Sequence, residues 1–186
     1  PSSAAAIRVD ADGPSEKSKQ LYAEEAKKPM EKDEGVFGRS NEVDTKSSSS
    51  SSSSATLANA SVLQGRFKPR KPQYLNKVKS GYDWNKYNRA HYDRDNPPPK
   101  TVQGYKFNIF YPDLIDPTQT PSYKLEAADT QDFCIIRFHA GPPYEDLAFK
   151  IVNKEWDIGR RTGYKSVFQR GVLMLHFNFK RLRYRR

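Results

Sequence analysis

Apolar and polar positions alternate with a period of two in the stretch that ends at Pro112. Every second position of this stretch carries a large side chain: Tyr105, Phe107, Ile109 and Tyr111. Successive side chains of a β-strand point to opposite faces, so this period is typical of a strand with one buried face. We therefore predict a strand here, with these side chains in the core.

Four more segments favour strands. Residues 133–138 form a short apolar run before Gly141 and two prolines, which predicts a central strand. Residues 164–168 and 172–179 alternate on either side of a short turn, which predicts a hairpin with a long second strand. Residues 123–127 are expected to form a short edge strand.

The segment 147–156 fits two periods. Leu147, Phe149 and Ile151 alternate as in a strand. Leu147, Ile151 and Val152 also have the spacing of one helix face. Both alternatives remain open from the sequence, and we favour the strand.

The segment 82–92 predicts the one helix of the domain. Trp84, Tyr87 and His91 fall on one face of such a helix, and the prolines 97–99 prevent its continuation. The predicted fold class is therefore α+β: a β-rich single domain with a mostly antiparallel sheet and one helix near its start. Its predicted core is formed by Tyr105, Phe107, Ile109, Ile135, Phe149, Leu173, Leu175 and Phe177.

Apolar residues are scarce in the first third of the chain. Of the 23 Tyr, Phe and Trp residues, only Tyr22 and Phe37 precede Gly65, and an unbroken serine run follows further on, at Ser47–Ser54. Such a segment buries too little apolar surface to offset its ordering entropy. We expect residues 1–64 to be disordered, with the serines as a flexible linker or a phosphorylation segment, and residues 65–186 to form the domain.

Charge divides at the same boundary. Of the net charge of +10, residues 65–186 carry +12 and residues 1–64 carry −2. A basic domain favours acidic partners, namely phosphate backbones, acidic protein surfaces or anionic membranes. No apolar run approaches the ~20 residues that span a bilayer, which argues against a membrane. The single cysteine, Cys134, excludes an intramolecular disulfide and favours the nucleus or cytosol.

Two clusters of cations are the candidate binding residues. The first lies at the start of the ordered region and consists of Arg66, Lys68, Arg70 and Lys71. The second lies at the end of the chain and consists of Lys180, Arg181, Arg183, Arg185 and Arg186, with Tyr184 among them. Alternate cations along a strand project together and can follow a phosphate backbone or an acidic helix. The alternatives are a solvated face or a nuclear import signal.

The titratable residues do not predict catalysis or a cofactor. Asp113 and Asp116 lie in a proline-rich turn, where Asp usually caps its own backbone. Cys134 and His139 are separated by an odd number of positions, which places them on opposite faces of a strand. The spacings of the histidines and the cysteine match no zinc pattern. We therefore expect no enzyme, metal site or cofactor.

Long unbroken phrases of the ordered region resemble the C-terminal domain of the cactin family. They are Ser80–Asn88, Asn96–Lys100, Val102–Asp116, Phe138–Asp146, Phe149–Asn153 and Phe179–Arg186. The resemblance implies a nuclear protein of the pre-mRNA splicing machinery that associates with the activated spliceosome. It also implies binding to Cactus, an inhibitor-of-kappa-B protein, and neither catalysis nor a cofactor. We can assign residues 1–64 to no part of this resemblance, and it implies no role for them.

Three functions are compatible with this pattern. The leading hypothesis is a non-catalytic interaction module of a splicing factor, with spliceosomal proteins and pre-mRNA or snRNA phosphates as partners. The first alternative is a free-standing RNA-binding domain. The second is a signalling adaptor that binds an ankyrin-repeat inhibitor-of-kappa-B protein. All three need a basic surface, so the sequence does not separate them.

Overall fold

The computed structural model describes residues 13–45, 69–84 and 86–181. The predictions for the serine run 47–54 and for six of the candidate binding residues lie outside this part of the chain. These residues are Arg66, Lys68, Arg183, Tyr184, Arg185 and Arg186.

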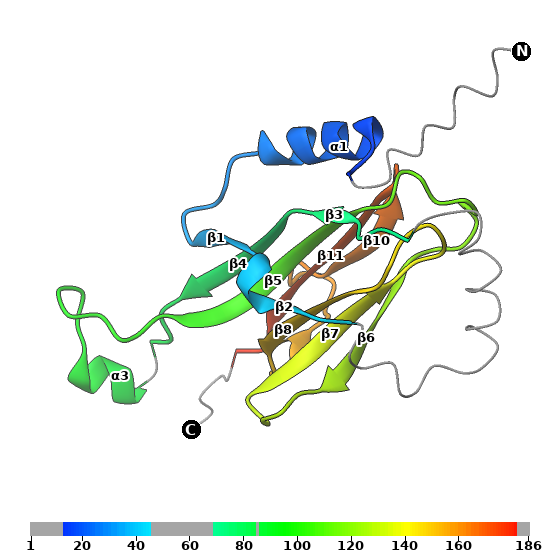
Figure 1. The fold of residues 1–186 in the computed structure, drawn as a ribbon. Helices are drawn as coiled ribbons and strands as arrows, with labels where there is room; N and C mark the ends of the chain where they lie inside the picture. Colours follow the sequence, from blue (N-terminus) through cyan, green and yellow to red (C-terminus); the bar gives the residue numbers. More distant parts are fainter. Residues whose placement is uncertain (1–12, 46–68, 85, 182–186) are drawn as a thin grey trace, which may run out of the picture.

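Two sheets make up the body of the described chain (Figure 1). The larger sheet has the order β1(Glu34–Phe37), β4(Asn76–Gly81), β5(Thr101–Phe110), β11(Val172–Phe179) and β10(Lys165–Gln169), with β3(Gln73–Tyr74) beside β5 and β9(Trp156–Asp157) beside β11. The smaller sheet has the order β2(Glu42–Val43), β8(Leu147–Val152), β7(Phe133–His139) and β6(Ser122–Ala127). Every strand pair in both sheets is antiparallel.

The core lies between the two sheets. Phe107 of β5 contacts Phe138 of β7 and Phe149 of β8, with ring centroids 5.1 and 5.6 Å apart. Phe177 of β11 is stacked on Trp156, with centroids 3.6 Å apart. The alternating pattern therefore predicts the burial of most core residues: Tyr105, Phe107, Ile109, Phe149, Leu173, Leu175 and Phe177 are all buried. The α+β, β-rich, mostly antiparallel fold class is confirmed.

One core assignment is wrong. Ile135 is half-buried on the outer face of β7, whereas Cys134, Ile136 and Phe138 point into the core. The run 133–136 is apolar at every position, so the sequence pattern cannot show which set of alternate side chains faces inward. The pairing of β7 with β6 and β8 decides it, because Ile136 lies opposite Phe149 in the ladder.

The ambiguous segment and the hairpin have the predicted form. Leu147–Val152 is strand β8, and Trp156–Asp157 is the short strand β9. Arg170 and Gly171 join β10 to β11 with φ of 52° and 76°. Positive φ at both central residues is the geometry of the two-residue turn whose twist matches a hairpin.

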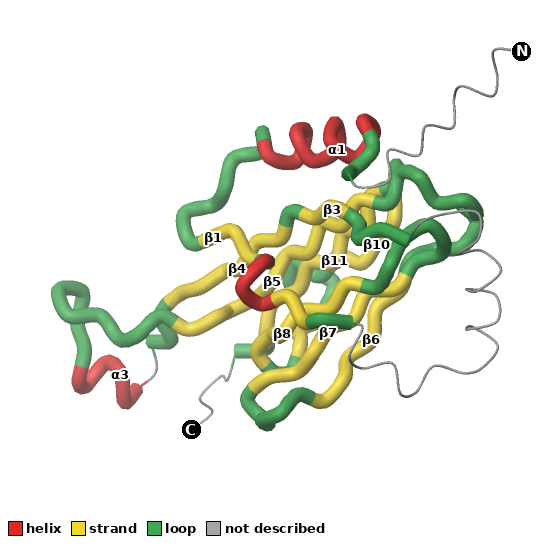
Figure 2. Tube along the Cα trace, viewed as in Figure 1, coloured by secondary structure: helices red, strands yellow, loops and turns green. Residues whose placement is uncertain are grey.

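The helix predicted near Trp84 is short. It is α3(Lys86–His91), and none of its residues is buried. Figures 1 and 2 show it at the far end of the β4–β5 hairpin, away from the two sheets. The predicted apolar face does not pack against the core, since the side chains of Trp84 and Tyr87 are 39% and 69% exposed.

The first 64 residues differ from the expectation of a wholly disordered segment. Within the described residues 13–45, α1(Glu16–Ala26) is capped by the side chain of Ser15, β1 extends the larger sheet beside β4, and β2 extends the smaller sheet beside β8. A short 3₁₀ turn, η2(Arg39–Asn41), joins the two strands. Low apolar content did not reveal these strands, because backbone hydrogen bonds and one ring hold them.

That ring belongs to Phe37, which enters the core from β1 with 7% exposure. Its centroid lies 5.0, 5.9 and 5.8 Å from those of Tyr105, Phe107 and Phe149. Residues 34–43 thus pass from the edge of one sheet to the edge of the other and close one side of the sandwich (Figure 1).

Helix α1 covers the outer face of the larger sheet next to β3. Tyr22 packs edge-on against Phe110, with centroids 6.2 Å apart, and Ser18 Oγ donates to Gln73 Oε1 at 3.0 Å. Leu75 and Phe110 are buried although they do not belong to the sandwich core. No helix among the described residues is long and apolar enough to cross a membrane.

We predict that Phe37→Ala lowers the free energy of unfolding by about 3–5 kcal/mol, because it leaves a cavity among three core rings. Val36→Ala on the same strand is the matched control, since Val36 is 69% exposed and should change stability by less than about 0.5 kcal/mol. Chemical denaturation of both variants measures this. Equal stabilities of Phe37→Ala and the unmodified chain would show that residues 34–43 do not belong to the folded unit.

A candidate nucleic-acid interface

The described cations of the first cluster are held by the fold. Arg70 Nη2 lies 2.9 Å from Asp113 Oδ2, its guanidinium lies over the ring of Tyr144, and its backbone bridges to residues 143–145. Lys71 Nζ lies 2.7 Å from Glu42 Oε1. These contacts tie the start of the domain to the β5–β6 loop and to β2, so both cations already have an anionic partner.

The second cluster lies at the opposite end of the larger sheet. Lys180 follows Phe179, the last residue of β11. Asp113, the partner of Arg70, follows the end of β5, and this end of β5 pairs with the first residue of β11. An eight-residue strand at about 3.3 Å per residue separates the two ends by about 26 Å. The structure therefore does not bring the described parts of the two clusters together.

Within the second cluster, Lys180 and Arg181 differ. Lys180 Nζ lies 2.8 Å from Glu155 Oε1, and this contact raises the pKa of the lysine. Arg181 is exposed and has no ion-pair partner among the described residues. Of the described cations in this cluster, Arg181 is the one free to meet a phosphate.

Further free cations gather around the end of β11. Asn178 Nδ2 donates to the carbonyl of Thr162 at 2.8 Å, which fixes the β9–β10 loop beside this strand end. The loop carries two exposed arginines, and β10 begins beside it with an exposed lysine. We call Arg160, Arg161, Lys165 and Arg181 the basic end; none of them forms an ion pair in the described part of the chain.

A row of basic side chains crosses the outer face of the same sheet. Lys77, Lys106, His176 and Lys165 lie opposite one another on β4, β5, β11 and β10. The N-terminal segment neutralises its centre: Lys106 Nζ is paired with the carboxylate of Glu34 and lies 3.7 Å from that of Glu31. Burial is the largest single influence and raises the pKa of Glu34, but the hydrogen bonds from Lys106 and from the backbone of Glu31, together with the positive charges of Lys106 and Lys77, leave the pKa below its usual value.

His176 is neutral in the middle of this row. Asn108 uses its amide NH₂ to donate to the carbonyl of Leu75, so its Oδ1 accepts from His176 Nε2 at 2.9 Å. Burial, followed by the positive charges of Lys106 and Lys165, lowers the pKa of His176 to about 4.

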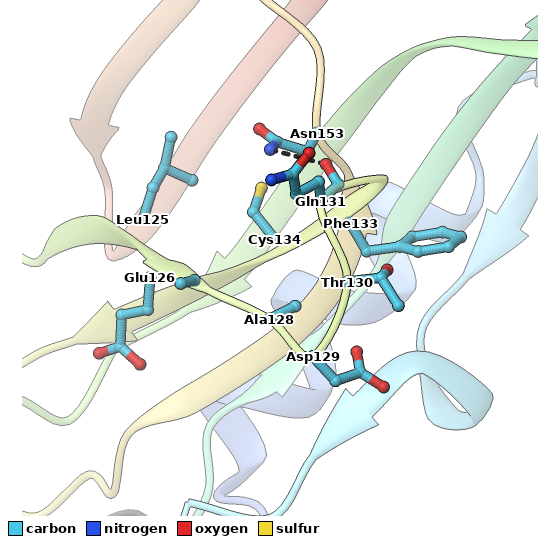
Figure 3. Close-up of a pocket in the computed structure, with 10 residues that line it drawn as sticks. Leu125, Glu126, Ala128, Asp129, Thr130, Gln131, Phe133, Cys134 and Asn153 are labelled. Atoms are coloured by element: carbon cyan, nitrogen blue, oxygen red, sulfur yellow. Dashed lines mark hydrogen bonds between the residues drawn. The ribbon is translucent and has the colours of Figure 1, made fainter.

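A shallow hollow of about 380 Å³ lies where β6 turns into β7 (Figure 3). Its acidic residues have partners: hydrogen bonds from Arg137 and Lys150 lower the pKa values of Glu126 and Asp129. Burial raises the pKa of the Cys134 thiol, which disfavours the reactive thiolate. Its lining residues therefore bring together no nucleophile and base.

The other candidate chemical residues have structural contacts. Asp113 is paired with Arg70, while Asp116 accepts hydrogen bonds from the backbone and hydroxyl of Thr118. His139 is exposed with Nδ1 2.6 Å from Asp146 Oδ1, a contact that raises its pKa. No group of three or more His, Cys, Asp or Glu side chains within the described ranges is placed to hold a metal ion.

Sequence reasoning missed Arg160, Arg161 and Lys165. Their signal is an arginine pair followed by a lysine, which is weak in a chain with 32 Lys and Arg. They join Arg181 only because β10 and β11 form a hairpin that returns the loop to the end of β11.

The fold and the charges define a β-sandwich domain with free cations at one end of its larger sheet. A family model described as the Cactus-binding C-terminus of cactin protein matches residues 63–186. The chain belongs to the cactin family.

Several relatives carry the name splicing factor Cactin. The protein of Toxoplasma gondii is 53% identical over 165 residues, which is 89% of this chain and 22% of the relative. That of Caenorhabditis elegans is 50% identical over 186 residues, 100% of this chain and 26% of the relative. The human protein is 50% identical over 181 residues, which is 97% of this chain and 22% of the relative. The chain thus spans about a quarter of the length of these relatives.

We predict that His176 makes the domain acid-sensitive. Its pKa is about 4 when folded and 6.5 when unfolded, so the unfolded chain binds an extra proton between these values. The free energy of unfolding should therefore be intact above pH 6.5 and fall by about 2–3 kcal/mol as the pH drops toward 4.

Urea denaturation across this pH range should show that the free energy of unfolding falls less steeply toward low pH in His176→Gln than in the unmodified chain. His139→Gln is the control of opposite sign. Because the pKa of folded His139 is raised, this residue contributes stability below pH 6.5 that is lost as the pH rises through the folded pKa. In His139→Gln the free energy of unfolding should therefore fall more steeply toward low pH than in the unmodified chain. Parallel curves for His176→Gln and the unmodified chain would contradict the prediction.

Proposed function

We propose that this domain is a non-catalytic interaction module of a nuclear pre-mRNA splicing factor, and that it associates with the activated spliceosome through protein and RNA contacts. The family membership and the splicing-factor names of the relatives support the splicing role. The basic end supports the RNA contact.

The basic end is the observation that carries the RNA part of the proposal. Most other cations of the sheets are neutralised by the chain itself: Lys106 by Glu34, Arg137 by Glu126 and Lys150 by Asp129. The basic end stays unpaired within the described residues, and the tail residues Arg183, Tyr184, Arg185 and Arg186 follow it in sequence. Phosphate is a fitting ligand because the free energy comes from release of its counterions.

A second candidate function is binding of an inhibitor-of-kappa-B protein. The description of the matching family model names Cactus, and this specific observation favours an acidic protein partner. The basic end suits an acidic protein surface as well as a phosphate backbone. Binding of RNA by the isolated chain separates the two functions.

We predict that the 186-residue chain binds short single-stranded RNA with a steep dependence on salt. Replacing the basic end by glutamine (Arg160→Gln, Arg161→Gln, Lys165→Gln and Arg181→Gln together) should weaken binding. It should also reduce the steepness of the slope of log affinity against log salt concentration by about 3, at ~0.7 per lost phosphate contact. Fluorescence anisotropy at several salt concentrations measures both effects.

The matched control removes the same charge elsewhere. Lys17, Lys19, Lys27 and Lys32 are exposed on the N-terminal segment. Their replacement by glutamine should leave the slope nearly unchanged. An equal loss in both quadruple variants would mean that net charge alone drives binding. Absence of RNA binding, together with binding of purified Cactus that depends on the basic end, would favour the adaptor function instead.

A further inference from the structure

The β4–β5 connection forms an arm that the fold leaves uncovered. The arm comprises the described residues 82–84 and 86–100, between Gly81 at the end of β4 and Thr101 at the start of β5, which lie opposite each other in the ladder. Figure 1 shows it projecting from the sheets with α3 at its far end. We therefore asked what its side chains do there, since they do not pack the core.

Three large aromatic side chains of the arm face solvent. Tyr82, Trp84 and Tyr87 are 36%, 39% and 69% exposed. The rings of Tyr82 and Trp84 lie 6.1 Å apart, and the ring of Tyr87 lies 4.5 Å from that of His91. Exposed rings grouped in this way mark a binding surface, because they gain nothing from water and are not needed for packing.

Cations alternate with these rings along the arm. Lys86, Arg89 and Arg94 form no ion pair in the described part of the chain, and Lys100 Nζ lies 5.5 Å from the ring centroid of Tyr82. Two of the acidic residues accept hydrogen bonds from β5 and from the arm. Asp83 accepts from the hydroxyl of Thr101, and Asp93 accepts from the backbone of residues 95 and 96.

The arm leaves the sheet at the same end as the basic end. Gly81 pairs with Thr101 of β5, and three residues further along β5 Gly104 pairs with Asn178 of β11. At about 3.3 Å per residue, this step along the strand is about 10 Å, so the start of the arm and the basic end are near neighbours. Asn178 is the residue that holds the loop of Arg160 and Arg161.

We propose that the arm is a stacking platform for the bases of single-stranded RNA whose phosphates follow the basic end. Solvent-facing rings interleaved with unpaired cations are what single-stranded nucleic acid requires: faces for the bases and charges for the backbone. A purely apolar protein groove would leave the unpaired Lys86, Arg89 and Arg94 without partners, so RNA fits the arm better. This inference rests on the RNA contact of the proposed function and adds a second site to it.

The test uses the 186-residue chain with Trp84→Ala and Tyr87→Ala together. Because no residue of α3 is buried and Trp84 is exposed, the melting temperature should stay unchanged. Affinity for single-stranded RNA should fall between about fivefold and a hundredfold for each ring removed. The salt slope should stay as in the unmodified chain, since no cation is lost.

Three controls sharpen the result. Trp84→Phe with Tyr87→Phe keeps both ring faces and should restore most of the affinity. Phe133→Ala removes an exposed ring from the smaller sheet and should leave RNA binding unchanged. Fully paired RNA hides its base faces, so the Ala variant should bind it as well as the unmodified chain does.

The outcomes separate this inference from the proposed function. Unchanged single-strand affinity in the Ala variant, with weakened binding in the basic-end variant, would overturn the stacking platform and leave the RNA contact standing. Loss of binding to purified spliceosomes without loss of RNA affinity would make the arm a protein contact, which also overturns it. If neither variant changes RNA binding, both proposals are wrong.

Discussion

The ring of Phe107 is the contact on which the rest of the fold depends. It meets Phe177 within its own sheet, Phe138 and Phe149 across the sandwich, and Phe37 from the N-terminal segment. Rings of this size bury large apolar areas and prefer tilted or edge contacts, so a few of them fill the space between two sheets. The position of each sheet is therefore set by the same small group of aromatic side chains.

This arrangement explains why the folded unit begins before residue 63, where the match to the family model starts. The relative from Caenorhabditis elegans matches the whole chain, so residues 1–64 also belong to the similarity, contrary to the expectation from the sequence. The larger sheet would otherwise end at β4 and the smaller one at β8, with unpaired backbone groups along both edges. Residues 34–43 pair with both edges, and Phe37 fills a place among the core rings. A segment with few apolar residues thus becomes structural because it supplies backbone hydrogen bonds and one anchor.

Several cations on the outer faces of the two sheets are neutralised by carboxylates of the same chain. On the smaller sheet, Arg137 and Lys150 have carboxylate partners on neighbouring elements, and on the larger sheet Glu31 and Glu34 neutralise Lys106. The unpaired cations of the described residues include the basic end, where β11 ends, and Lys86, Arg89 and Arg94 of the arm. The proposed binding residues lie on exposed loops and strand ends and not in the core, so their replacement should cost little stability.

The sequence by itself determined the strands with a clear period of two, the hairpin turn and most of the core, because side-chain alternation and turn geometry are local properties. It did not determine that Ile135 faces outward, since a continuous apolar run has no readable parity and only the ladder with β8 decides it. It predicted a helix near Trp84 but not that its aromatic face lies in solvent, because burial depends on what the chain brings to that face. The structured part of residues 1–64 was decided by tertiary pairing, because β1 and β2 pair with strands far along the chain and composition does not encode such ladders. The basic end needed more than the predicted hairpin, because the hydrogen bond from Asn178 to Thr162 holds the loop of Arg160 and Arg161 beside the end of β11.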